Sequence, residues 1–221
     1  MRIINEQVLP KELLLVIEND ELEWDGGAII SSIEYFGDDA KIILSILLDR
    51  SEEAQSWAIQ LKGVRNEYIQ REWSEDIVVY DQHFLIDEQK DSITELYIKN
   101  RAKDPYKLLH DLYLHFLSKF NGCIAFDKYL NKSHDFEFLL QMTDGLFAQG
   151  PEFILKEINS ILNQNGCETY FWGDRVSQRW SNNQCIDETS NLIVLCIGDS
   201  YYIAEEITFT RLNNDHKINP L

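Results

Sequence analysis

Residues 28–48 have the sequence AIISSIEYFGDDAKIILSILL, and this stretch indicates the fold of the N-terminal half of the chain. Its first part, residues 28–36, is rich in β-branched and aromatic residues, which favour strands. Its last part, residues 41–48, is a second apolar run of strand length. The residues between them, Gly37-Asp38-Asp39, are typical of a tight turn. The stretch therefore predicts two antiparallel strands that are joined at this turn.

Further short strands are expected up to residue 98. Residues 56–61 (SWAIQL) and 93–98 (ITELYI) alternate between the two sides of a strand, and residues 67–73 do so more weakly. Residues 77–80 (IVVY) and 83–86 (HFLI) predict one bent strand or two. About six short strands with polar turns between them are typical of an antiparallel meander or a small barrel.

Helical signals begin at Asp104-Pro105, because Asp is a good N-cap and Pro is favoured at the first helical position. Apolar residues then recur at helical spacing over residues 108–120, and Asn121-Gly122 supplies a stop. A second helix is expected between Gly150-Pro151 and Asn165-Gly166.

The rest of the C-terminal half is expected to combine strands with a short helix. Residues 123–126 (CIAF) and 168–172 (ETYFW) predict strands, and Ser133 can cap a short helix between them. Residues 192–197 and 201–210 predict a β-hairpin that turns at Gly198-Asp199-Ser200.

Together these elements predict an α+β fold. An antiparallel, strand-rich N-terminal part, residues 1–103, is followed in residues 104–221 by two or three helices and a C-terminal β-hairpin. Two domains and one continuous domain both fit this pattern, because Asp104-Pro105 marks a change of secondary structure and not a flexible linker.

The chain has 38 acidic and 20 basic residues, and its net charge of −18 is spread over both halves. Such a field repels phosphate backbones and anionic membrane surfaces, so we expect neither a nucleic acid nor a membrane as a partner. It attracts a basic protein and speeds the encounter with it. Solubility alone also accounts for an acidic surface, so the charge does not by itself define a function.

The four cysteines, Cys123, Cys167, Cys185 and Cys196, contain no C-x-x-C pair, which argues against a zinc finger. The apolar run near the N-terminus, residues 13–17, is too short for a signal-peptide core or a membrane-spanning helix. We therefore expect free thiols in a reducing cytoplasm.

No metal site and no cofactor are expected. His110 and His115 lie five residues apart on a predicted helix, so they are about 140° apart around its axis and do not share a face. Residues 21–26 place acidic residues as an EF-hand loop does, but Ser32 stands where that loop needs a bidentate glutamate. The chain also has no nucleophile elbow, no phosphate-binding loop and no dinucleotide fingerprint. No motif therefore names a reaction or a family.

One segment combines positive charge with aromatic side chains, and it is WGDRVSQRW, residues 172–180. Arg and Trp dominate binding hot spots, and an Arg pair on an acidic protein can bind an anion or a carboxylate. The same residue types are also ordinary at strand ends, where Arg stacks on aromatic rings. The candidate binding residues are Trp172, Asp174, Arg175, Arg179 and Trp180.

Two hypotheses about function follow. The first is a noncatalytic acidic protein-binding module, for example an inhibitor or immunity-type protein that covers a basic toxin or enzyme; a subunit of a permanent assembly differs from it only in the lifetime of the complex. The alternative is an enzyme or small-ligand-binding protein with a pocket between the two halves. The polar candidates for that pocket are His83, His110, Asp111 and Arg175.

Overall fold

The computed structural model describes residues 1–22, 27–48, 54–120, 123–175, 179–181, 184–186 and 191–212, with the backbone alone from residue 174 to residue 186. The fold is α+β with antiparallel sheets, as the sequence predicts. Its contacts define two compact units: unit 1 is Met1–Asp87 with Thr189–Leu221, and unit 2 is Glu88–Glu188. The predicted parts, residues 1–103 and 104–221, rest on secondary structure and not on contacts, and that division stays a prediction.

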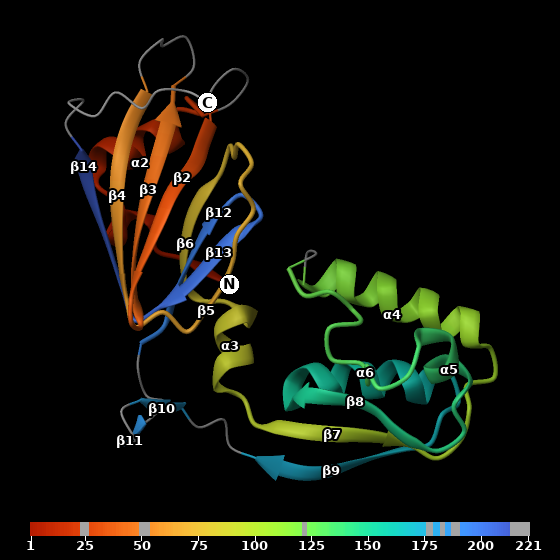
Figure 1. The fold of residues 1–221 in the computed structure, drawn as a ribbon. Helices are drawn as coiled ribbons and strands as arrows, with labels where there is room; N and C mark the ends of the chain where they lie inside the picture. The colour runs from red at the N-terminus through yellow and green to blue at the C-terminus, as the bar shows by residue number, and fades with distance from the viewer. Residues whose placement is uncertain are drawn as a thin grey trace. The chain divides into compact units, whose positions relative to one another are not determined.

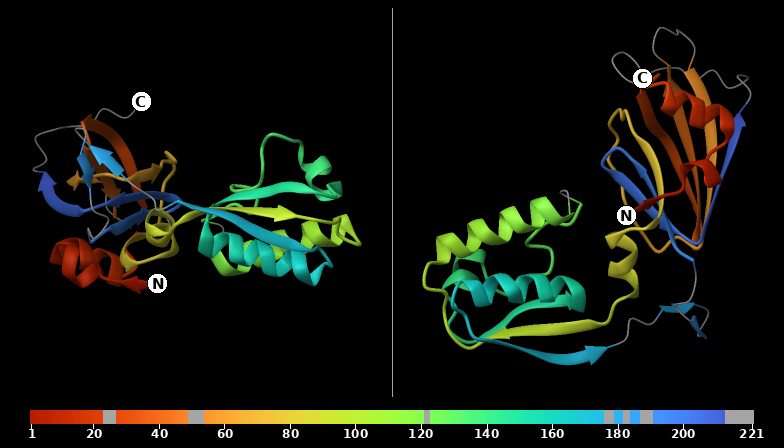
Figure 2. Two further views of the ribbon diagram at one scale, coloured as in Figure 1. Left: turned by 90° about the horizontal axis from the view of Figure 1, so that it is seen from below. Right: turned by 180° about the vertical axis from the view of Figure 1, so that it is seen from behind.

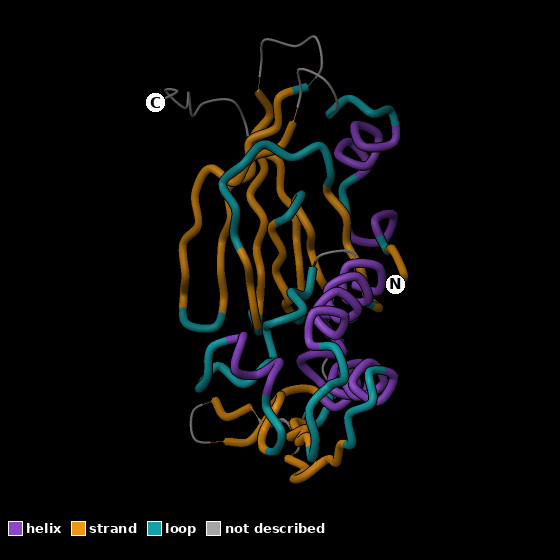
Figure 3. The backbone as a smooth tube through the Cα atoms, turned by 90° about the vertical axis from the view of Figure 1, so that its right-hand side faces the viewer, coloured by secondary structure: helices purple, strands orange, loops and turns teal. Residues whose placement is uncertain are grey.

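Unit 1 contains two antiparallel sheets (Figure 1). The four-stranded sheet has the order β14 (Glu206–Leu212), β4 (Ala54–Lys62), β3 (Asp39–Leu47) and β2 (Gly27–Phe36). The five-stranded sheet has the order β1 (Arg2–Ile3), β6 (Ile77–Gln82), β12 (Ile193–Ile197), β13 (Ser200–Ala204) and β5 (Asn66–Tyr68). The longer strands run side by side along the unit (Figure 3).

Strands β2 and β3 are the antiparallel pair that residues 28–48 predict, and Phe36 pairs with Asp39 at the turn. Gly37 has a φ of +68° there, a conformation that L side chains rarely adopt, so glycine suits the turn. β3 pairs in turn with β4, from Ala40 to Leu47.

Every second residue of the central strands is buried in the core of unit 1. One hydrophobic cluster joins residues of both sheets. Fully burying a large apolar side chain stabilises a fold by about 1.5–3 kcal/mol, so this cluster is the main source of cohesion between the sheets. Its members include Ile42, Leu44, Ile46, Trp57, Ile59, Leu61, Ile77, Val79, Leu195, Ile197 and Tyr202.

Two short helices, α1 (Asn5–Val8) and α2 (Lys11–Glu18), lie on one side of these strands and are red in Figure 2. α1 contacts β6 of one sheet and β14 of the other. From α2, Leu13 and Val16 are buried in the hydrophobic cluster. The two helices therefore cover apolar surface that the sheets alone would leave exposed on this side.

Unit 2 contains a three-stranded antiparallel sheet with helices on one side of it (Figure 1). The strand order is β8 (Gly145–Pro151), β7 (Ile93–Ile98) and β9 (Thr169–Arg175). Helix α6 (Glu152–Gln164) contacts all three strands, and α4 (Pro105–Phe120) contacts both α6 and α5 (Phe136–Gln141). A two-stranded pair, β10 (Arg179–Ser181) and β11 (Gln184–Ile186), follows β9.

The two long helices of unit 2 begin and bury their faces as the sequence predicts. Asp104 caps α4, because its Oδ1 accepts the backbone N–H groups of Tyr106 and Lys107 at 3.0 and 3.1 Å. The buried faces of α4 and α6 consist of apolar residues at helical spacing. They are Leu108, Leu112, Phe116 and Phe120 on α4, and Ile154, Leu155, Ile158, Ile161 and Leu162 on α6.

The prediction of a strand over residues 83–86 is wrong, because helix α3 spans Phe84–Lys90. A side-chain cap at His83 favours the helix, and strand propensities do not take such a cap into account. His83 is buried, and its Nδ1 accepts the N–H of Leu85 at 3.2 Å. An imidazole in this place satisfies one of the free N–H groups of the first helical turn.

Three further predictions fail locally in the C-terminal half. Residues 123–126 form bends and a turn and not a strand. The Phe126 ring packs edge-on against Tyr113 of α4 and not within a sheet. Asp135, and not Ser133, caps α5, because its Oδ1 accepts the N–H of Phe138 at 2.7 Å. The expected strand over residues 201–210 is two strands, β13 and β14, which belong to different sheets.

Among the described helices, none is both long enough and apolar enough to span a bilayer.

Replacing Asp104 with Ala is expected to lower the free energy of unfolding by about 1 kcal/mol, because two N–H groups at the start of α4 lose their acceptor. Urea unfolding followed by circular dichroism measures the change. Asp104→Ser is the matched control, since a serine hydroxyl still accepts at an N-cap. Equal losses in both variants would contradict the capping role.

Candidate functional site

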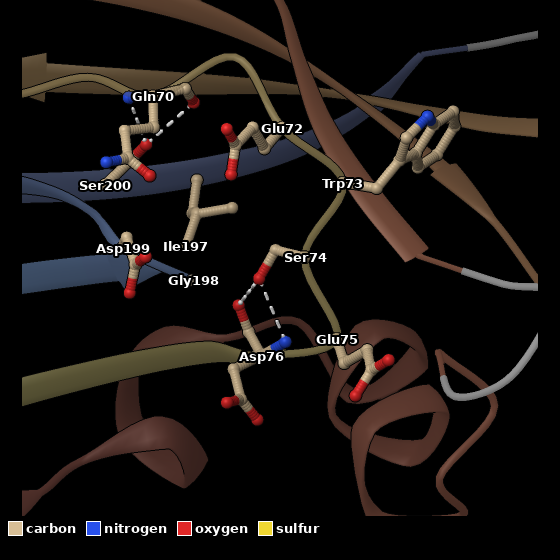
Figure 4. A pocket seen from close by; sticks show the side chains of 10 residues that line it. All are labelled: Gln70, Glu72, Trp73, Ser74, Glu75, Asp76, Ile197, Gly198, Asp199 and Ser200. Atoms are coloured by element: carbon tan, nitrogen blue, oxygen red, sulfur yellow. Dashed lines mark hydrogen bonds between the residues drawn. The ribbon is translucent and has the colours of Figure 1, made fainter.

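A pocket of about 250 Å³ opens in unit 1 (Figure 4). One wall is the segment between β5 and β6, which contributes Gln70 and residues 72–76. The other wall is the turn between β12 and β13, residues 197–200. We call this the acidic pocket, because four of its lining residues are carboxylic acids: Glu72, Glu75, Asp76 and Asp199.

The turn that forms one wall needs a glycine. Ile197 pairs with Ser200, so Gly198 and Asp199 form a two-residue hairpin loop, as the sequence predicts. Gly198 has a φ of +55°, and a Cβ on it would lie 2.6 Å from the Ser74 hydroxyl. Both observations exclude a larger residue at this position without rearrangement.

Hydrogen bonds shape the opposite wall and connect it to β13. The buried Ser74 hydroxyl donates to the Asp76 carbonyl at 3.0 Å and accepts the Asp76 N–H at 3.1 Å. The buried Ser200 hydroxyl accepts the N–H of Gln70 at 2.8 Å and donates to the Gln70 carbonyl at 2.9 Å. The backbone of the pocket is therefore held in place while its acidic side chains face solvent.

The charge of the pocket is not compensated within the described chain. Glu72, Glu75, Asp76 and Asp199 are exposed, and none of them forms an ion pair with a described residue. In Figure 4, Glu72 extends over Ile197, whereas the Trp73 side chain, 57% exposed as a residue, points the other way. Such a group of carboxylates can bind cationic groups by charge-assisted hydrogen bonds.

Unit 2 carries a second surface feature, formed by Tyr97 of β7 and by Tyr170 and Trp172 of β9. Tyr97 stacks on Tyr170 with ring centroids 5.1 Å apart, and Trp172 meets Tyr97 edge-on at 6.4 Å. The hydroxyl of Tyr97 donates to Glu95 at 2.9 Å, and this hydrogen bond raises the pKa of Tyr97. We call these three rings with Glu95 the aromatic face.

The structure places the candidate residues of segment 172–180 on two strands. Trp172, Asp174 and Arg175 belong to β9, and Arg179 and Trp180 belong to β10. Trp172 is 65% exposed. The side chains of the other four lie outside the described residues, so their role in binding stays a prediction.

The alternative candidates lie in different units. His83 belongs to unit 1, where its ring packs between Tyr80 and Phe84 with centroids at 4.9 and 4.0 Å. His110 and Asp111 are neighbours on α4 in unit 2, with Nδ1 and Oδ1 3.4 Å apart. The enzyme or small-ligand alternative stays a prediction.

Asp111 connects α4 to the end of α6. It accepts hydrogen bonds from Lys107 and from the Nδ2 of the buried Asn165, the latter at 3.0 Å. These hydrogen bonds, that of Lys107 first, lower the pKa of Asp111 to about 2. Its contacts are those of a residue that holds two helices together.

Sequence reasoning identified Trp172 but missed the other residues that form the two features. The segment REWSED, residues 71–76, carried the signal for the acidic pocket, since it sets an exposed Trp among three acids between two strands. The alternation of residues 93–98 placed Glu95 and Tyr97 on the same side of a strand, but it did not identify their partners on β9. Among the described residues, no group of three or more His, Cys, Asp or Glu side chains is arranged to hold a metal ion.

No protein-family model matches the chain, and neither a curated protein nor a solved structure is significantly similar to it.

Stability is expected to fall as the pH is lowered from about 6.5 to about 4, and His83 is one cause. Burial, with a smaller effect of the N-terminal amine, lowers the pKa of His83 from 6.5 to about 4. In this pH range the unfolded chain binds a proton at His83 that the folded chain does not, so acid favours unfolding. Urea unfolding at several pH values measures the slope.

His83→Asn keeps a cap acceptor but removes the titration, so its stability should depend less on pH in this range. His134→Asn is the matched control, since His134 is exposed. A slope unchanged in His83→Asn would contradict the assignment.

Asp111 is expected to stabilise the fold above pH 4 and to lose this effect as the pH falls toward 2. Its pKa is lowered from 3.8 to about 2, so acid protonates the unfolded chain first. The difference in unfolding free energy between the wild type and Asp111→Asn should therefore shrink over this range. Asp127→Asn, at an exposed aspartate, should show no such change. A difference that stays constant with pH would argue against the ion pair.

Proposed function

We propose that this chain is a noncatalytic acidic protein-binding module whose partner is a basic protein. The observation that carries the proposal is the acidic pocket. Its four carboxylates have no ion-pair partner among the described residues. A basic side chain that enters the pocket supplies the missing counter-charge.

The charge of the whole chain supports the same proposal. A net charge of −18 creates a long-range field that draws a cationic protein toward the surface and raises the association rate. The same field repels nucleic acids, so they are not proposed as partners. An inhibitor or immunity-type protein that covers a basic toxin or enzyme is one form of this function.

The two serine hydroxyls of the pocket serve its backbone. Ser74 and Ser200 are buried, and their hydroxyls are engaged with backbone groups of Asp76 and Gln70. Neither hydroxyl is therefore offered as a nucleophile. We propose the cytoplasm as the compartment, since Cys167 is buried as a free thiol and such thiols are typical of reducing compartments.

The immobilised chain is expected to retain a basic protein from native lysate at low salt, about 0.05 M, and to release it at about 0.5 M, because salt screens exposed charges. The variant Glu72→Gln/Glu75→Gln/Asp199→Asn should retain much less of the same protein. Gel electrophoresis and mass spectrometry of the eluted proteins measure both effects.

The matched control is Glu6→Gln/Glu18→Gln/Glu34→Gln, which removes the same charge from exposed sites elsewhere in unit 1. It should lower retention only slightly. Retention that does not depend on salt would contradict the electrostatic proposal. Equal losses in both triple variants would show that net charge, and not the pocket, accounts for the binding.

A further inference from the structure

The aromatic face lies on the side of the unit 2 sheet that α6 does not cover. On β7, Thr94, Leu96 and Ile98 are buried, so Glu95 and Tyr97 point to the opposite side. Cross-strand partners share a side, and Glu95 pairs with Trp172 while Tyr97 pairs with Tyr170. Among the described strands, only β7 pairs with β9, so the face extends to a sheet edge.

Aromatic side chains on this face remain accessible. Trp172 is 65% exposed and Tyr170 is 39% exposed. Tyr97 holds both, because it stacks on one ring and meets the other edge-on. An exposed indole that is kept in position by a neighbouring ring loses little conformational entropy when a partner stacks on it.

The chain itself already places a cation on this face. The Nζ of Lys99 lies 5.1 Å from the centroid of the Tyr170 ring, within the range of a cation–π contact. The rings therefore favour positive charge. No residue of the chain fills the same role over Trp172 among the described cation–π contacts.

Glu95 adds a carboxylate next to the exposed indole. Its Oε2 accepts the Tyr97 hydroxyl at 2.9 Å, and its Oε1 accepts the Gln149 amide at 3.4 Å. Each carboxylate oxygen has two acceptor positions, so both oxygens can accept a further hydrogen bond. Directly opposite side chains on paired strands lie about 5 Å apart at Cβ, so one guanidinium can stack on the indole and reach Glu95.

We propose that the aromatic face binds arginine side chains of the basic partner, with Trp172 as the stacking surface and Glu95 as the carboxylate. This inference rests on the proposed function, because it names the side chain by which the partner is recognised. A guanidinium is planar and pairs with a carboxylate through two parallel hydrogen bonds, whereas an ammonium is a strongly hydrated point charge. The face therefore selects arginine over lysine, which net charge alone does not.

The test compares two labelled peptides of equal charge, nona-arginine and nona-lysine, by fluorescence anisotropy with the full chain at about 0.15 M salt. The wild type should bind nona-arginine about fivefold more tightly than nona-lysine, the size of one exposed cation–π contact. In Trp172→Ala the two affinities should become nearly equal. Glu95→Gln should weaken nona-arginine binding more than nona-lysine binding.

Tyr106→Ala is the matched control, because Tyr106 of α4 is an aromatic residue that is 80% exposed and lies outside both surface features. It should leave the preference for arginine intact. Circular dichroism tests whether each variant is folded.

Three outcomes would overturn the inference. The first is equal affinity of the wild type for both peptides; salt-sensitive binding of both would then still support the proposed function. The second is a preference that survives in Trp172→Ala, which would assign the arginine contact to another part of the chain. The third is binding of neither peptide at low salt, which would count against the proposed function as well.

Discussion

Burial of Thr94, Leu96 and Ile98 beneath α6 fixes the direction of every other side chain on β7. Because side chains alternate along a strand, the same burial turns Glu95 and Tyr97 outward. A shift of one residue in the pairing with β9 would exchange the two sides and place charge in the core, so the register is strongly specified. The side of β7 that packs against α6 must be apolar, so Glu95 and Tyr97 lie on the other side. The same alternation of buried and outward-facing residues holds in the core strands of unit 1.

The side chains that stabilise the fold and those proposed for recognition are separate sets. The core of each unit consists of fully buried apolar residues, whereas Trp73, Trp172 and the pocket carboxylates are exposed. Exposed ion pairs contribute only about 0–1 kcal/mol to stability, so leaving these carboxylates without partners costs the fold little. The cost lies instead in mutual repulsion among acidic groups, which the proposed cationic partner would relieve.

The elements that could be predicted from the sequence are those decided by local chemistry. Residues 28–48 contain both strand-forming runs and the turn between them, and Asp104 is the cap of α4. The helix after His83 was not predictable in this way, because an imidazole acts as the cap and the apolar residues behind it also suit a strand. Short apolar runs have this ambiguity in general.

The candidate sites could be predicted only in part, because each is assembled by strand pairing between distant segments. Segments 70–76 and 197–200 meet because β6 pairs with β12, and Tyr97 meets Trp172 because β7 pairs with β9. Trp172 was identifiable from its own segment, but the ring that holds it was not. Local composition reports which residue types are available, whereas the register of the sheet decides which of them become neighbours.

The two surface features differ in the interactions by which each is proposed to bind a cation. The acidic pocket offers several exposed carboxylates, so its attraction acts over a Debye length and weakens steeply with salt. The aromatic face offers rings and a single carboxylate, so it acts at contact distance and depends on the shape of the cation. A long-range field speeds association with any cationic protein, so it does not discriminate between kinds of cation. A planar stacking surface discriminates between them because it fits a planar guanidinium. Under the proposed function, the charge would set the rate of association, and Trp172 and Glu95 would set the choice of partner.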